Sequence, residues 1–321
     1  MDQNDSLPPS PPATSQRLVS LDVLRGFDMF WILGMEQVGA ALVKGSDSGW
    51  ARAVATQLDH APWAGFHCLD LIFPMFLFIS GVSLVFSADK SLESQGRPKT
   101  VRKMLWRAII LYVLGLITYG LFSKGMEHVR WVGVLQRIAI CGFAAGMAYL
   151  FIGRTGRVIL ALGLLAGYWA LMTFVPVPGI GAGHFAEGQN LANWIDANYL
   201  TGRKWDGDHD PEGLLSTLPA IATALLGVFT GEWLKRGPAE VWKKAAALIL
   251  GGTALAFLGW AWHGQFPIIK KLWTSSFVLV TGGYSMVLLG FFYILVDGFR
   301  WRAAFTPFIW IGMNPITLYM A

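Results

Sequence analysis

The chain has 321 residues, of which 54% are hydrophobic and 14% are charged, and its mean hydropathy is +0.49. Average soluble domains carry about 25% charged residues, so this composition argues against a soluble enzyme and indicates a membrane protein. The two cysteines, Cys68 and Cys141, both lie in apolar segments, which excludes a disulfide framework and a CxxC metal site.

The first 17 residues are polar and rich in proline. They lack the charged start, the apolar middle and the small-residue cleavage site of a signal peptide. We therefore predict a disordered cytoplasmic tail over residues 1–17, followed by a single transmembrane domain over residues 18–321.

Nine stretches are apolar and long enough for membrane-spanning helices, which need about 20 residues each. We predict an all-α polytopic helical bundle in the membrane, with roughly nine to eleven transmembrane helices. The ninth stretch is short and has no polar flank, so we expect the chain to end within that helix. In chain order, the stretches lie at about 21–43, 67–88, 105–123, 131–152, 157–175, 213–234, 242–262, 272–296 and 305–321.

Lysine and arginine set the expected orientation, because cytoplasmic loops are enriched in them. With the amino terminus inside, the inner loops and ends carry sixteen of these residues and the outer loops carry eight. The net charge of +5 therefore reflects membrane topology and not nucleic-acid binding. This orientation places His60 outside, together with a long acidic loop at about 176–212.

Ionisable and polar side chains inside a span are costly unless they face a partner or a cavity, so they are functional candidates. Asp28 and Glu36 lie in the first stretch, eight residues apart, which puts them about 80° apart around a helix. Arg25 is one turn from Asp28. Arg137 lies in the fourth stretch and Asn314 in the ninth.

Each of these charges also has a structural interpretation. Arg25 can be an interfacial anchor, Arg137 can be the partner of a carboxylate, and Glu36 can reach water. We expect Asp28 or Glu36 to pair with Arg25, with Arg137 or with a substrate ammonium.

His60 lies just before the second stretch, in the block HAPWAGFHCLDLIFPMFLFISG at residues 60–81. A histidine at this position can be a solvated loop residue, an interfacial anchor or a catalytic base. Imidazole titrates near neutral pH and suits a base, and either Asp59 or Asp70 can orient its ring.

Several familiar motifs are absent from the sequence, including the P-loop, the GxSxG elbow and HExxH. Asp206, Asp208, His209 and Asp210 resemble a metal cluster. Because five consecutive residues do not converge easily on one ion, we predict no metal site.

Six blocks of this sequence, in order between residues 17 and 319, resemble the heparan-α-glucosaminide N-acetyltransferase family. Besides the block from His60 to Gly81, they are RLVSLDVLRGFDMF, GVLQRIA, DPEGLLSTLPAIATALLGVFTGEWL, PIIKKLWTSSFVL and GMNPITLY. The resemblance implies an integral membrane enzyme, as in bacterial members of an inner membrane, with the amino terminus in the cytoplasm. Such an enzyme transfers acetyl from cytosolic acetyl-CoA to the amino group of a glucosamine-type sugar on the opposite side.

The resemblance also implies residue roles. His60 matches the active-site histidine of the family's H-x-x-W-x-G block, and we add Asp70 and Glu36 as further catalytic candidates. Expected partners are the amino sugar, acetyl-CoA and the lipid bilayer, with a homodimer to be tested and with neither metal nor nucleic acid. Residues expected to bind substrate are Asp28, Trp63, Arg137 and Asn314, and residues expected to bind the CoA phosphates are Arg25, Arg102, Lys103 and Arg107.

Three alternatives stay open at this level. The buried charges also suit a transporter for amino sugars, and the opening motif with a histidine base suits an O-acetyltransferase of cell-envelope glycans. The basic cluster around Arg102 is also what the enrichment of cytoplasmic loops in positive charge would produce without any ligand.

Overall fold

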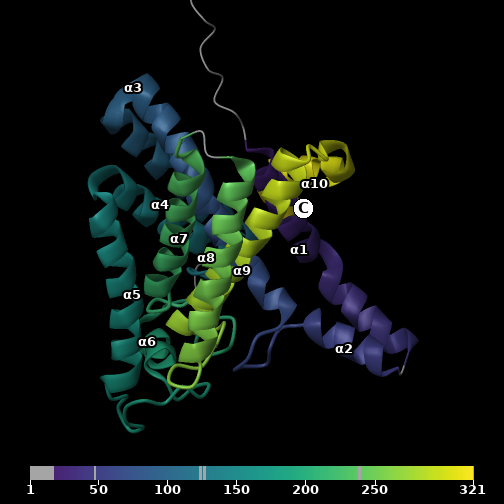
Figure 1. Ribbon diagram of the computed structural model, residues 1–321. Coiled ribbons are helices and arrows are strands. Elements are labelled where there is room, and N and C mark those ends of the chain that lie inside the picture. Colours follow the sequence, from purple (N-terminus) through teal and green to yellow (C-terminus); the bar gives the residue numbers. More distant parts are fainter. Residues whose placement is uncertain (1–17, 47, 123–124, 126–127, 238–239, 321) are drawn as a thin grey trace, which may run out of the picture.

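The computed structural model describes residues 18–46, 48–122, 125, 128–237 and 240–320, so the predicted tail over residues 1–17 lies outside the described residues. The described chain forms helices and isolated bridges but no β-strand, which confirms the all-α prediction (Figure 1). The elements are α1 (Val19–Gly45), α2 (Gly49–Gln57), η1 (Cys68–Leu71), α3 (Ile72–Thr118), α4 (Val134–Phe151), α5 (Arg154–Phe174), α6 (Leu191–Tyr199), α7 (Thr217–Lys235), α8 (Val241–Trp262), α9 (Ser275–Phe292), η3 (Tyr293–Gly298), η4 (Arg302–Phe305), α10 (Thr306–Met313) and α11 (Pro315–Met320).

Six helices in the described chain are long and apolar enough to cross a membrane, which confirms a polytopic membrane protein. They begin with a 51-residue segment, η1 together with α3, and continue with α4, α5, α7, α8 and the segment from α9 to η3. The remaining two predicted spans, the first and the ninth, correspond to α1 and to the pieces η4, α10 and α11.

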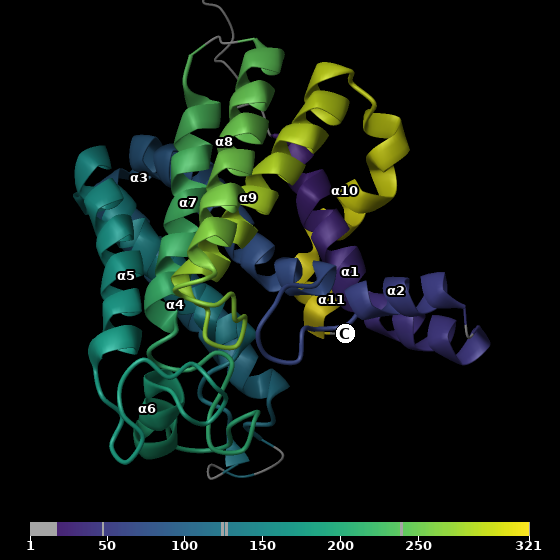
Figure 2. The ribbon, with the colours of Figure 1, turned by 60° about the horizontal axis from the view of Figure 1, so that its bottom comes forward.

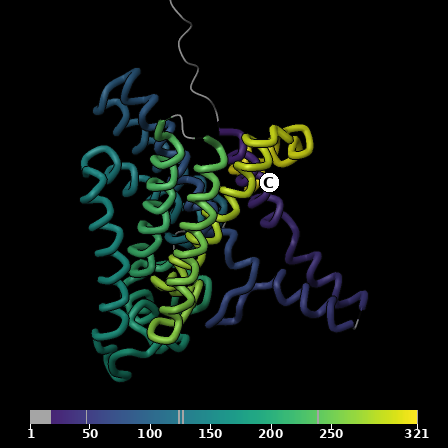
Figure 3. Tube along the Cα trace, viewed as in Figure 1, coloured from purple at the N-terminus to yellow at the C-terminus, as the bar shows by residue number. Residues whose placement is uncertain are grey.

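Helix α3 folds back on itself at Gly96, whose φ of +75° lies in the region that favours glycine. The hydroxyl of Thr100 donates to that of Ser91 at 3.0 Å, although the two residues are nine positions apart. The two limbs therefore run antiparallel (Figure 3). The predicted spans at 67–88 and 105–123 are the two limbs of this one folded element.

Close helix crossings at small residues hold the centre of the bundle together. A Cβ atom on Gly81 of α3 would lie 2.0 Å from the carbonyl oxygen of Ala224 in α7, and one on Gly227 would lie 2.0 Å from that of Phe78. Only glycine permits this approach, and membrane helices commonly pack through such small residues. The crossing fixes the first limb of α3 against α7.

Helix α1 leaves the bundle at an angle and continues into α2, so the two form an arm at one side of the molecule (Figures 1 and 2). Its first half packs on α10, where a Cβ atom on Gly26 would lie 1.8 Å from the carbonyl oxygen of Phe308. The backbone then departs from helical geometry at Gly34. Helix α1 covers the first predicted span but is not among the six helices with the composition of a membrane span.

The prediction of a single helix over residues 305–321 is wrong. The chain forms α10, with eight residues, and α11, with six, and neither is long enough to span a membrane. The break falls at Asn314 and Pro315. Proline has no backbone N–H and disfavours helical geometry at the residue before it, and Asn314 has φ −127° and ψ 45°.

The bundle has two polar ends. One end, which we call the site face, carries the loop around His60, the loop between α8 and α9, and the long loop containing α6. The opposite face carries ion pairs between Lys235 and Asp89 and between Arg157 and Glu232. The basic loops that we predicted to be cytoplasmic begin or end at this opposite face.

Candidate active site

Two loops pair on the site face and bring His60 to the entrance of α3. The backbone N–H of Gly65 donates to the carbonyl of Ile268 at 2.9 Å, and Ala64 forms an antiparallel bridge with Ile269. Gly65 has a φ of +123°, which only glycine adopts readily. This pairing holds the loop before α3 against the loop between α8 and α9.

Asp70 orients the ring of His60. Its side chain is fully buried, and its Oδ1 lies 2.9 Å from Nδ1 of His60. The other oxygen, Oδ2, accepts from the backbone N–H groups of Ala61 and His67 at 3.2 and 3.0 Å. Asp59 accepts instead from the backbone N–H of His60, at 2.7 Å. Of the two carboxylates considered, Asp70 therefore contacts the ring and Asp59 contacts the backbone.

Lys270 completes this cluster and was not among the predicted site residues. Its Nζ lies 2.8 Å from Nδ1 of His60, 3.2 Å from Nε2 and 3.3 Å from Oδ1 of Asp70. Burial lowers the pKa of Lys270, although the charge of Asp70 opposes this shift. The sequence shows the lysine but not that its loop folds over the loop of His60, so spacing alone does not reveal it.

Glu36 lies beside the cluster without touching the imidazole. It lines a pocket of about 410 Å³ between α1 and α2, together with Arg52 and Asp59, the residue before His60. Its negative charge also favours the protonated form of Lys270. The structure thus brings Glu36 into the neighbourhood of His60 and Asp70.

Trp63 lies at the rim of the site. Its Nε1 donates to the carbonyl of Phe185 at 2.8 Å, and its ring packs edge-on against His209 and faces Nζ of Lys271. The loop of His60 is thereby tied to the long loop between α5 and α7.

A group of three candidate metal ligands lies beyond Trp63, with ligand atoms of Glu187, Asp206 and His209 within 4.8 Å of one another. It differs from the group considered from the sequence, because Asp208 contacts the other ring nitrogen of His209 and Asp210 binds Arg130. Nζ of Lys271 lies 3.1 Å from Glu187 and 3.0 Å from Asp206. The ammonium of Lys271 thus offsets one of the two negative charges of this group.

A buried ion-pair network lies under the long loop and was also missed from the sequence. Arg130 makes two hydrogen bonds to Asp210, of 2.7 and 2.6 Å, and pairs with Glu212. Its guanidinium lies over the rings of Tyr119 and Trp205. Burial raises the pKa of Glu212, while Arg130 opposes this shift. This network anchors the loop to the second limb of α3.

Arg137 lies in the interior next to this network. Its Nη2 donates to the carbonyl of Gly213 and to the hydroxyl of Ser216, and its guanidinium lies 5.0 Å from the ring centre of Trp273. Its Nε and Nη1 have no hydrogen-bond partner in the part of the chain that the structure describes. The backbone N–H of Trp273 donates to the carbonyl of Lys270 at 2.9 Å. Trp273 therefore lies between Arg137 and the cluster of His60, Asp70 and Lys270.

The expected pairing of Asp28 with an arginine is wrong. Asp28 is fully buried, and within the described residues neither of its oxygens has a hydrogen-bond partner. Arg25 donates to Ser83 at 2.6 Å and contacts Asp22 at 3.3 Å. Asp28 lies three positions after Arg25 in sequence, but α1 turns their side chains toward different neighbours.

Asn314 stands at the break between α10 and α11 and is exposed. It lies on a different element from the loops that form the histidine cluster. Its assignment as a substrate-binding residue therefore rests on the sequence alone.

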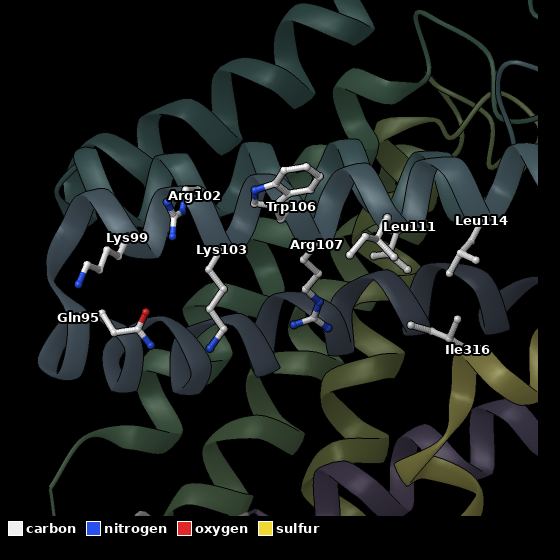
Figure 4. Close-up of a pocket in the computed structure, with 10 residues that line it drawn as sticks. Gln95, Lys99, Arg102, Lys103, Trp106, Arg107, Leu111, Leu114 and Ile316 are labelled. Atoms are coloured by element: carbon white, nitrogen blue, oxygen red, sulfur yellow. The ribbon is translucent and has the colours of Figure 1, made fainter.

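A cationic pocket of about 470 Å³ lies along the second limb of α3 (Figure 4). Arg102, Lys103 and Arg107, the three residues of α3 expected to bind phosphate, line it, and Lys99 extends the charge. Its other end is apolar and is lined by Leu111, Leu114 and Ile316 of α11. Arg25, also predicted to bind phosphate, is not among the residues that line it.

A sequence profile described as "Heparan-alpha-glucosaminide N-acetyltransferase, catalytic" matches residues 17–261. The chain belongs to this family. The human protein named heparan-alpha-glucosaminide N-acetyltransferase is 27% identical over 366 residues, which cover 96% of this chain and 53% of the human protein. The mouse protein of that name is 28% identical over 319 residues, which cover 81% of this chain and 48% of its own length. The chain thus spans about half the length of these curated relatives.

The matched residues of this heparan-α-glucosaminide N-acetyltransferase family member include His60, Asp70, Glu36 and Arg137. The arrangement suits acid–base chemistry, because a buried carboxylate holds one ring nitrogen of an accessible imidazole. The side chain of His60 is 47% exposed, so its ring is open to a substrate arriving at the site face.

Proposed function

We propose that the protein is a membrane-embedded acetyltransferase that moves an acetyl group from acetyl-CoA to the amino group of a glucosamine-type sugar. The observation that carries this proposal is the accessible imidazole of His60 held by buried Asp70, in a chain of the heparan-α-glucosaminide N-acetyltransferase family. His60 is the proposed general base, and Asp70 orients it.

The chemistry explains the need for a base. The ammonium of an amino sugar has no lone pair, so it must lose a proton before its nitrogen attacks the thioester carbonyl. Nε2 of His60 takes that proton while Nδ1 donates to Asp70. The new C–N bond forms as the C–S bond breaks, and the departing CoA thiolate takes up the second proton that the nitrogen loses on becoming an amide. Direct transfer and a short-lived acetyl-histidine are both compatible with this geometry.

We assign the acceptor sugar to the site face. The pocket between α1 and α2 presents the carboxylates of Glu36 and Asp59 next to His60, and these attract an ammonium group. Trp63 supplies an apolar wall at the rim. Arg137 has two guanidinium nitrogens without a protein partner in the described chain, and they suit oxygen atoms of a bound substrate. The roles of Asp28 and Asn314 in substrate binding stay predictions.

We assign the phosphates of acetyl-CoA to the cationic pocket on α3, where Arg102, Lys103 and Arg107 lie in a row along one limb (Figure 4). The apolar end of the pocket reaches Ile316, and Tyr319 of the same short helix interacts with Tyr119 below Arg130. The thin, uncharged part of acetyl-CoA that carries the acetyl group would follow this surface and approach the site face from within the bundle. A role for Arg25 in phosphate binding is not supported by its contacts with Ser83 and Asp22.

The proposed sidedness follows from the distribution of positive charge. The site face is extracytoplasmic, and the opposite face and the amino terminus are cytoplasmic. The protein then lies in a cell membrane, as in the bacterial inner membrane, with donor and acceptor reaching the centre from different sides.

The direct test mixes purified protein with radiolabelled acetyl-CoA and glucosamine. Labelled N-acetylglucosamine, stable to mild alkali, is the expected product. An alkali-labile ester would instead favour O-acetylation of glycans. Uptake of sugar into vesicles without any acetylated product would favour a transporter and contradict the proposal.

A further inference from the structure

Resting on the proposed role of His60, we infer that Lys270 is a positioning residue that keeps the imidazole neutral, with the lone pair that acts as the base on Nε2. Its ammonium lies against the ring and against Asp70 at the same time. It lies in the block PIIKKLWTSSFVL, and it acts on the reaction only through His60.

The geometry around Nδ1 is a conflict between two partners. Oδ1 of Asp70 lies 2.9 Å from this nitrogen, and Nζ of Lys270 lies 2.8 Å from it. A carboxylate needs a proton on Nδ1, whereas an ammonium needs a lone pair there. Nδ1 cannot carry a proton and a lone pair at once, so the neutral imidazole adopts one of its two tautomers.

The contacts of Asp70 favour the tautomer with the proton on Nδ1. Oδ2 of Asp70 is fixed by two backbone N–H groups, and within the described residues Oδ1 contacts Nδ1 of His60 and Nζ of Lys270. An N–H on Nδ1 satisfies this buried oxygen, and Lys270 keeps its ion pair with the same atom at 3.3 Å. The lone pair of the imidazole is then on Nε2, which is where the proposed reaction needs it.

The ammonium also disfavours a second proton on the ring. Nζ lies 3.2 Å from Nε2, and a like charge at this distance opposes formation of an imidazolium. Asp70 contacts both groups, and its charge, with those of Glu212 and Glu36 at longer range, favours the protonated form of Lys270. His67 places its ring on the carbonyl of Asp59 and not on His60. Lys270 is thus the cation that balances the carboxylates around this base.

Lys271 provides a matched control next in sequence. Its ammonium contacts Glu187 and Asp206 and not the imidazole. Lys270→Met removes the charge next to His60 while keeping the aliphatic stem, and Lys270→Arg restores a cation. Lys271→Met removes one charge from the same loop.

The measurement is the pH dependence of acetyl transfer by the purified full chain. In Lys270→Met we expect the pH at which activity rises to increase by about 1 pH unit. In Lys270→Arg we expect this pH to return toward the value of the unmodified protein. In Lys271→Met we expect the pH at which activity rises to stay unchanged. Loss of activity in Lys270→Met without any movement of the pH profile would overturn the inference and leave Lys270 a structural residue.

A second readout does not depend on acetyl transfer. Ring ¹⁵N NMR of histidine-labelled protein, assigned by difference with His60→Ala, reports the tautomer of His60 directly. We expect the Nδ1–H tautomer in the unmodified protein, and an imidazolium signal that persists to higher pH in Lys270→Met. Identical titrations would overturn the inference. If these spectra respond as expected in a protein without transferase activity, the proposed function fails and the role of Lys270 stands.

Discussion

Two residues next to each other in space, His60 and Asp70, are ten positions apart in sequence and lie on either side of a turn. A histidine with carboxylates nearby in sequence was enough to predict Asp59 or Asp70 as the partner of its ring, but not to choose between them. Lys270 was not predictable, because it comes from a loop 210 residues away. The expected pairing of Asp28 with Arg25 or Arg137 failed for a related reason, since spacing along one helix does not reveal what packs against it.

His60→Ala tests the chemistry at this scale. General-base catalysis is commonly worth about 10²–10⁴-fold, so we expect the transfer rate to fall by that factor while thermal stability changes little. His184→Ala, at an exposed loop position, should leave the rate unchanged. Full activity in His60→Ala would make the histidine an interfacial anchor.

At the scale of elements, apolar length identified most helices but not how they join. The fold-back of α3 depends on one glycine with positive φ, and the break after α10 depends on one proline. Both are local backbone effects that a count of apolar residues does not detect. The long acidic loop was predicted, but its attachment through Arg130 was not, because that requires a partner from a distant segment.

Arg130→Met tests the attachment of this loop to α3. The substitution leaves Asp210 and Glu212 buried without their cation, and breaking a buried pair typically costs about 3–5 kcal/mol. We expect a matching fall in thermal stability in detergent. Arg203→Met, in an exposed position of the same loop, should change stability by less than about 0.5 kcal/mol. Equal effects of the two substitutions would contradict the network.

The loop is also attached through Lys271, and this attachment predicts that the stability of the folded protein depends on pH. Burial alone would lower the pKa of Lys271, but its bonds to Asp206 and Glu187 raise it. The native state therefore binds this proton more tightly than the unfolded chain does. The stabilisation is complete below the unfolded value of about 10.4 and is lost as pH rises through the higher native value.

Lys271→Met should therefore lower stability by about 0.5–1 kcal/mol at neutral pH. The difference from the unmodified protein should be constant up to about pH 10 and shrink above it. Thermal denaturation between pH 7 and 12 measures this difference. A difference that grows with rising pH would contradict the assignment.

At the scale of the whole molecule, composition predicted the membrane class and the distribution of charge predicted an asymmetry between the two ends. The structure gathers Arg102, Lys103 and Arg107 around one pocket, which the sequence could not distinguish from ordinary enrichment of a cytoplasmic loop. A pocket requires a second wall, and here the neighbouring limb of α3 and Ile316 provide it.

Charge reversal of Arg102 and Lys103 together tests the donor site. We expect weaker acetyl-CoA binding at low salt and a smaller effect at high salt, because exposed charges are screened over about 10 Å at 0.1 M ionic strength. Calorimetric titration at two salt concentrations measures this. Reversal of Lys243, on the same face but outside the pocket, is the control. Unchanged affinity at low salt would assign the phosphates elsewhere.

Transfer across a sealed membrane tests the central claim most directly. The protein is reconstituted into liposomes that enclose labelled acetyl-CoA, and a glucosamine-terminated oligosaccharide that cannot cross the bilayer is added outside. We expect labelled N-acetylated oligosaccharide in the external medium, with a yield about 10²–10⁴-fold lower for His60→Ala. Product formed only when acetyl-CoA and the oligosaccharide are on the same side would contradict a site that draws its two substrates from opposite faces.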